Sequence, residues 1–154
     1  MSEKCCSARF TNRFINILCL CMYSLRLSAK QRYNKRVTAG ISALLALESS
    51  LDSGSMGASQ VYFTSEGEGT WEDLSAAGYL LSNAFRRNST AAPDSLPSVK
   101  KWKAFAADIA VLEKIAKKGK DKDCASALAA LKKAEASLDA YLDAVELPSV
   151  DEMK

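Results

Sequence analysis

The chain has 154 residues, a length that suits one domain with a single hydrophobic core. Hydrophobic residues make up 48% and charged residues 25%, which is typical of a folded globular protein and argues against a disordered, collagenous or polytopic membrane chain. Histidine is absent, so the commonest general base and the commonest zinc ligand are missing. We therefore expect no catalytic residues, no metal and no cofactor.

The charge of the chain is unevenly distributed. Residues 1–36 carry eight Lys or Arg and one acid, Glu3, whereas the rest has thirteen bases and seventeen acids. The net charge of +3 therefore hides a basic segment and a mildly acidic remainder. Nucleic-acid binding needs several Lys or Arg on one face, so we do not expect it of residues 37–154.

The basic segment also contains an apolar stretch, residues 14–27, with the sequence FINILCLCMYSLRL. A membrane-spanning helix needs about 20 mainly apolar residues, so this stretch is short for a span and fits the hydrophobic region of a targeting peptide better. No A-x-A cleavage site follows it. We interpret residues 1–36 as a targeting or anchoring extension, with an ordinary folded helix as the alternative.

Cysteine is concentrated in the same segment, which contains four of the five: Cys5, Cys6, Cys19 and Cys21. Their spacing does not match the C-x2-4-C pattern of zinc knuckles, so a metal site is not expected there. The fifth, Cys124, is interpreted as a small apolar residue within a helix.

The first helix of the folded part is predicted over residues 38–52, where Ile41, Leu44 and Leu45 recur at helical spacing. Residues 53–69 contain four of the seven glycines. We therefore predict that this stretch is a long connection with a short extended piece rather than a helix.

Capping signals and periodicity predict three further helices. Thr70 should cap the second, with Asp73 imitating a capping box. The third starts near Pro97 and ends at Gly119, and Asp123 should cap the fourth. The inward face of the second helix is predicted to be Leu74, Gly78, Leu81 and Phe85. That of the third is Trp102, Phe105, Ile109, Leu112 and Ala116. That of the fourth is Leu128, Leu131, Leu138, Leu142 and Val145.

Four amphipathic helices bury their apolar faces most simply against one another, so the predicted fold class is all-α. Residues 37–148 are expected to form a four-helix bundle, preceded by the basic and apolar extension of residues 1–36. Residues 149–154 are predicted to form a carboxyl-terminal tail. The short turn at residues 120–122 forces the third and fourth helices to lie antiparallel.

Motifs for known chemistry are missing from the sequence: it has no phosphate-binding glycine loop, no nucleophile elbow, no zinc-protease helix and no calcium loop. The remaining candidates are Tyr62, Phe63 and Trp71, because no helical period buries them. They either anchor a partner interface or strap the bundle shut, and both interpretations stay open. The basic pair Arg86 and Arg87 would add a salt-sensitive contact at the rim of such an interface.

Two segments of the carboxyl-terminal half, LPSVKKW at residues 96–102 and LDAYLDAVELP at residues 138–148, flank an alanine-rich helical region. In these segments the chain resembles the PsbQ-like proteins of chloroplasts and algae, small four-helix bundles on the lumenal side of photosystems. The resemblance implies a non-catalytic extrinsic subunit without cofactors. It implies peripheral docking on photosystem core or antenna subunits in the thylakoid lumen, at photosystem II or photosystem I, and it assigns no ligand residues.

Two other classes of function compete with this one. An unrelated helical adaptor or inhibitor bundle, which acts by protein–protein binding, fits the bare sequence equally well. An enzyme or pigment carrier is disfavoured by the missing histidine and motifs. Association with thylakoid membranes would separate the docking subunit from the adaptor, and an absorption spectrum would test for pigment.

Overall fold

The computed structural model describes residues 8–85, 92–119 and 121–153. Every regular element in these ranges is helical, so the predicted all-α class is confirmed. The α-helices are α1 (Ala8–Asp52), α2 (Gly57–Thr64), α3 (Trp71–Ala84), α4 (Pro97–Lys118), α5 (Cys124–Ala144) and α6 (Val150–Met153). Two short 3-10 helices, η1 (Pro93–Ser95) and η2 (Asp121–Asp123), precede α4 and α5.

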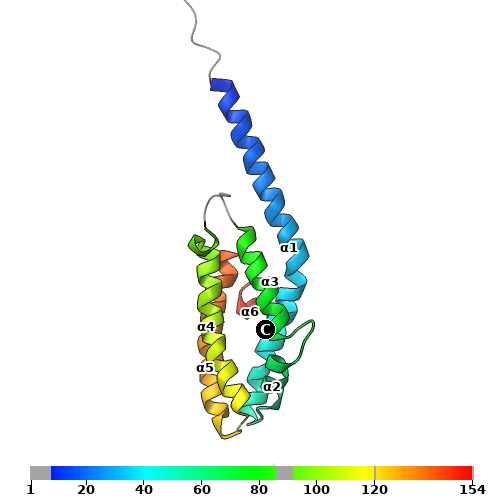
Figure 1. Cartoon of the computed structure of the whole chain (residues 1–154), viewed down its shortest axis with the longest axis vertical. Coiled ribbons are helices and arrows are strands. Elements are labelled where there is room, and N and C mark those ends of the chain that lie inside the picture. The colour runs from blue at the N-terminus through cyan, green and yellow to red at the C-terminus, as the bar shows by residue number, and fades with distance from the viewer. Residues whose placement is uncertain (1–7, 86–91, 120, 154) are drawn as a thin grey trace, which may run out of the picture.

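Helix α1 is much longer than the sequence predicts. It begins at Ala8 rather than near residue 38 and continues without a break to Asp52. No glycine or proline lies between residues 8 and 39, so no backbone feature ends the helix where the charge changes at residue 36. The amino-terminal part of α1 extends beyond the other helices (Figure 1).

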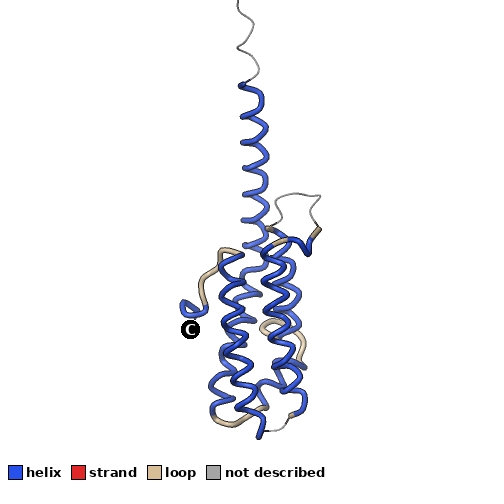
Figure 2. The backbone as a smooth tube through the Cα atoms, turned by 90° about the vertical axis from the view of Figure 1, so that its left-hand side faces the viewer, coloured by secondary structure: helices blue, strands red, loops and turns tan. Residues whose placement is uncertain are grey.

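The four longer helices pack side by side around one core. Helix α1 contacts α3 and α5, and α4 contacts the same two helices. Helices α4 and α5 are antiparallel, because Trp102 lies beside Tyr141 near one end of the pair and Asp108 pairs with Lys133 further along. This confirms the orientation that the short turn predicts. The backbone view shows the four helices running along one long axis (Figure 2). We call residues 30–153 the helical body.

The core is built from the predicted inward faces. The line along α4 is buried from Trp102 to Ala116, and in α5 Leu131, Leu138 and Leu142 are fully buried. Leu128 and Phe85 differ from the prediction, because each is only partly buried. Cys124 and Ala127 take the buried positions in the first turn of α5 instead, which fits the interpretation of Cys124 as a small apolar residue.

The ends of α4 follow the predicted signals. Pro97 is its first residue, where the missing N–H of proline costs no helical hydrogen bond. Gly119 follows the last turn with φ of 67°, in the left-handed region that favours glycine. Its N–H donates a hydrogen bond to the carbonyl of Ala116 at 3.0 Å. The start and the end of this helix could therefore be read from the sequence.

The predicted side-chain caps do not form. Thr70 occupies the N-cap position of α3, but its Oγ1 donates to the carbonyl of Gly67 at 2.7 Å instead of capping the helix. Asp73, the expected partner in a capping box, pairs with Arg36 of α1. Asp123 precedes α5 and makes no capping hydrogen bond either. A tertiary ion pair has replaced the local interaction at Asp73.

The prediction of an extended piece within residues 53–69 is wrong, because that link contains α2. Ser59, Tyr62 and Phe63 lie three and four residues apart and form the buried face of this helix. The link turns on either side of α2, where Gly54 and Gly67 adopt φ of 81° and 113°. Helix α2 lies against α1 and α4.

Within the predicted tail of residues 149–154, Val150–Met153 form α6. Within it, α6 contacts α5, and Val150 is buried. The N–H of Val150 donates a hydrogen bond to Oδ1 of Asp139 at 2.9 Å. Helix α5 ends at Ala144, and the chain then folds back so that α6 joins the core.

Candidate interaction site

The two aromatic residues of the link lie inside the chain. Tyr62 is 5% exposed and Phe63 is 9% exposed. The Tyr62 hydroxyl donates a hydrogen bond to the carbonyl of Gly40 in α1 at 3.1 Å, and burial raises the pKa of this phenol. Both rings pack α2 against the core and offer almost no surface to a partner. This corrects the alternative in which these two residues anchor an interface.

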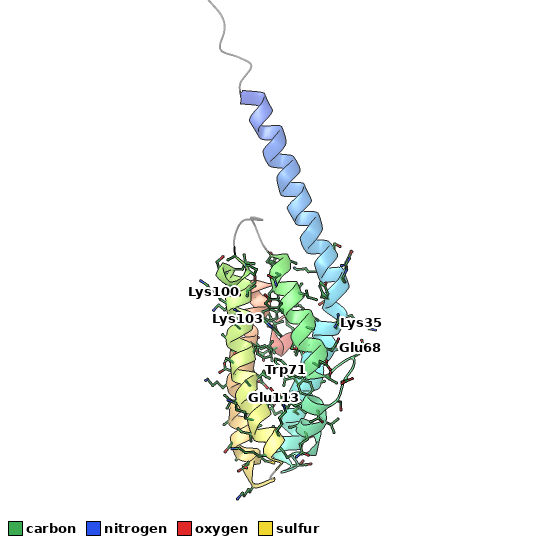
Figure 3. The ribbon with its side chains drawn as sticks, in the orientation of Figure 1. Lys35, Glu68, Trp71, Lys100, Lys103 and Glu113 are labelled. Atoms are coloured by element: carbon green, nitrogen blue, oxygen red, sulfur yellow. The ribbon has the colours of Figure 1, made fainter. Side chains whose placement is uncertain are left out.

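Trp71 continues the same aromatic cluster into the centre of the molecule (Figure 3). Its ring is 6.4 Å from Phe63, stacks on Trp102 at 6.2 Å, and meets Phe105 edge-on at 6.1 Å, all measured between ring centroids. The side chain is partly buried and packs against the core. Trp71 therefore works mainly as a packing residue, with only part of its surface open to a partner.

Gly78 of α3 lies where three helices meet. A Cβ at this position would overlap the indole ring of Trp102 from α4. Its carbonyl accepts hydrogen bonds from the Tyr141 hydroxyl of α5 at 3.1 Å and from the Ser82 hydroxyl at 2.6 Å. Burial is the main cause that raises the pKa of Tyr141. The sequence predicts Gly78 on an inward face, but the crossing itself was not predicted. A glycine within an apolar helical line is a usable signal for such a crossing.

The other proposed contact, Arg86 and Arg87, lies outside the described residues. Just before this pair, α3 presents two exposed apolar side chains, Tyr79 at 38% and Leu80 at 45% exposure. The prediction from the sequence missed this surface, because Leu80 lies next to Leu81 of the predicted inward face. We call Tyr79 and Leu80 the α3 patch. These two residues are small in area, but they are the exposed apolar side chains of α3 nearest to the proposed basic pair.

Two ion pairs connect neighbouring helices. Arg36 of α1 pairs with Asp73 of α3, and its Nε lies 2.9 Å from Asp73 Oδ1. The hydrogen bond to Asp73 raises the pKa of Arg36. Across the α4–α5 contact, Lys133 lies 2.9 Å from Asp108, and this hydrogen bond lowers the pKa of the Asp108 carboxyl. These charges fix helix positions rather than form a site.

Lysines gather at both ends of α4. Lys100, Lys101 and Lys103 follow its first residues, and Lys117 and Lys118 are in its last turn. Figure 3 shows Lys100 and Lys103 near the end of the helical body where α4 begins. Lys103 pairs with Asp94 at 2.7 Å, and Lys117 pairs with Glu113 at 2.6 Å.

Within the described part of the chain, no three Cys, Asp or Glu side chains come together in a way that could hold a metal ion. In the same residues, no helix combines the length and apolar character needed to cross a membrane. Comparison with other proteins adds no relative: no family model, no curated protein and no solved structure matches this chain.

Proposed function

We propose that this chain is a four-helix bundle that acts as a non-catalytic, extrinsic photosystem subunit of the PsbQ-like kind. Its place would be the thylakoid lumen of a chloroplast, where it would stabilise a photosystem complex by docking on core or antenna subunits. The sequence resemblance in residues 96–102 and 138–148 is the starting point. No cofactor and no catalytic residue takes part in this proposal.

The buried aromatic residues leave docking to side chains on the outer surface of the body. Helices α4 and α5 contain most of the resembling segments, and their side chains Trp102, Phe105 and Tyr141 pack inside the core. A core packed in this way would hold the outer surface of the bundle in a fixed shape. A rigid core lets a small number of surface side chains dominate binding, because few groups must be ordered on association.

The α3 patch replaces the buried rings as the proposed anchor. Tyr79 and Leu80 are adjacent on α3, and tyrosine is one of the side chains that contribute most at protein interfaces. Arg86 and Arg87 follow the same helix in sequence and keep the role proposed from the sequence, a salt-sensitive contact at the rim. The docking surface would then run along the carboxyl-terminal half of α3 and beyond it.

The test is binding of the purified chain to photosystem particles stripped of their extrinsic subunits. The double substitution Tyr79→Ala and Leu80→Ala should weaken binding at least tenfold without a change in helical signal or thermal midpoint. Val111→Ala is the matched control, since Val111 is an exposed apolar residue, at 49%, on α4.

Equal binding of the patch variant and the control would overturn the proposed surface. Failure of the wild-type chain to bind either photosystem would overturn the proposed function. In that case the alternative is an unrelated helical adaptor or inhibitor. It would be tested by affinity capture of partner proteins with the wild-type chain, compared with capture by the variant Tyr79→Ala and Leu80→Ala.

A further inference from the structure

We propose that the outer face of α4 binds an anionic lipid surface, with the long axis of the helical body parallel to that surface. The contact is made by four exposed lysines, Lys100, Lys103, Lys114 and Lys118, which we call the α4 lysine row. The inference rests on these side chains and does not depend on the photosystem partner of the proposed function.

The α4 lysine row follows one side of the helix. Its members are three, eleven and four positions apart, a spacing that keeps them on one face of an α-helix. Lys100 and Lys118 are separated by 18 positions, which is about 27 Å along the helix axis. The opposite side of α4, from Trp102 to Ala116, is buried in the core. Figure 3 shows Lys100 and Lys103 on the side of α4 away from α1.

Positive charge is concentrated on this helix. Helix α4 contains six lysines and two acids, a net charge of +4, whereas the net charge is −2 for α3 and −1 for α5. The side chains of the two acids, Asp108 and Glu113, are only 18% and 25% exposed, and they pair with Lys133 and Lys117. No acid of α4 therefore lies within the row.

Acids of the neighbouring elements weaken one end of the row. Asp94 of η1 pairs with Lys103 at 2.7 Å. Asp143 of α5 is exposed at the end where α4 begins, because α4 and α5 are antiparallel. Lys114 and Lys118 lie in the second half of α4, and neither forms an ion pair with a described residue. We therefore expect this half of the row to contribute most to the contact.

The composition of this face favours lipid headgroups over a protein partner. The exposed residues between the two halves of the row are small, namely Ala104, Ala107 and Val111. Helix α4 has no arginine, and its two aromatic residues are buried. Protein interfaces depend on aromatic residues and arginine and are depleted in lysine. Clusters of about four to eight basic residues on a helix instead attract anionic headgroups, which need no shaped anchor.

The length of the row determines the orientation. A flat surface contacts both Lys100 and Lys118 only when the long axis of the helical body lies parallel to it. Helix α1 lies across the core from α4, since both contact α3 and α5, and it continues along the long axis of the body (Figures 1 and 2). This orientation therefore does not require residues 8–29 to enter the lipid.

The experiment is flotation of the full chain with phosphatidylcholine vesicles that contain or lack phosphatidylglycerol. The wild type should bind the anionic vesicles more tightly, and added salt should weaken binding. Lys114→Gln with Lys118→Gln should lower the partition coefficient by up to about 25-fold, since each base near an anionic surface contributes about fivefold. Adding Lys100→Gln should lower it further, by a smaller factor, because Asp143 lies at that end.

The matched control is Lys35→Gln with Lys132→Gln. It removes the same charge from exposed lysines of α1 and α5, which pair with Glu68 and Glu48 away from the row. This variant should bind like the wild type. Residues 1–36 are also basic, but they are equally basic in both row variants, so a difference between a row variant and the wild type reports on α4.

Four results would overturn the inference. A loss in the row variant no larger than in the control would show attraction by net charge or by residues 1–36. A loss caused by Lys100→Gln alone would show contact through one end of the body. No binding of the wild type to anionic vesicles would remove the lipid contact, and binding to photosystem particles would then leave the proposed function in place. A row variant that loses binding to photosystem particles but keeps vesicle binding would assign the row to an acidic protein surface.

Discussion

The indole ring of Trp102 lies so close to Gly78 that no side chain fits between helices α3 and α4 at that point. The Tyr141 hydroxyl of α5 donates a hydrogen bond to the carbonyl of the same glycine at 3.1 Å. Gly78 is therefore required for space at a helix crossing, and the aromatic cluster depends on it.

Gly78→Ala should destabilise the protein. The added methyl group must push the Trp102 ring away, and overpacking of this kind costs roughly 1–3 kcal/mol in the free energy of unfolding. Urea unfolding followed by circular dichroism measures the effect. Gly57→Ala is the control, because the nearest atom to a new Cβ there is 3.8 Å away, and it should be neutral or slightly stabilising. A Gly78→Ala variant as stable as the wild type would contradict the close contact.

Trp102→Ala and Leu131→Ala should each lower the free energy of unfolding by roughly 2–5 kcal/mol, because both side chains are buried and their removal leaves cavities. Thermal and urea midpoints measure the loss. Val111→Ala changes an exposed residue of α4 and should stay within about 0.5 kcal/mol of the wild type. The reverse order would mean that the inward face of α4 has been assigned incorrectly.

Alkaline pH should destabilise the protein through Tyr62 and Tyr141. Burial raises both phenol pKa values in the folded state, so above pH about 10 the unfolded chain loses protons that the folded chain keeps. Stability is therefore complete below that pH and falls as the pH rises. Tyr62→Phe should flatten the fall, at a cost of about 1 kcal/mol at neutral pH for the lost hydrogen bond to Gly40.

Urea midpoints at several pH values between neutrality and strong alkali would measure this dependence. Tyr79→Phe alters an exposed tyrosine and should keep the wild-type slope. An unchanged slope in Tyr62→Phe would show that the buried phenol does not contribute to alkaline unfolding.

Asp73→Asn should lower the stability by less than about 1 kcal/mol, because its partner Arg36 is 39% exposed and water screens the pair. The loss should shrink as salt is added. A double-mutant cycle with Arg36→Gln isolates the coupling between the two side chains. Lys35→Gln breaks a pair with Glu68 in which both partners are well exposed, and it should have no measurable effect. A coupling energy between Arg36 and Asp73 no larger than that between Lys35 and Glu68 would show that the Asp73 ion pair does not stabilise the contact between α1 and α3.

The sequence by itself determined which residues face inward on the long helices and where α4 begins and ends. Trp102, Phe105 and Ile109 recur at the helical period, and Pro97 and Gly119 have backbone preferences that act locally. These features depend only on neighbours within a few positions along the chain. A periodic apolar line in a single sequence is therefore enough to predict them.

Only the tertiary structure decided which partners Tyr62, Asp73 and Gly78 contact. The hydroxyl of Tyr62 bonds to Gly40, 22 residues earlier, and Tyr141 reaches Gly78 from 63 residues away. Asp73 forms an ion pair with Arg36, 37 residues earlier in the sequence, instead of a local capping interaction. No local pattern contains these partners, because they come together only when the helices pack. The same packing leaves the first 22 residues of α1 beyond the helical body, a separation that no break in the sequence marks.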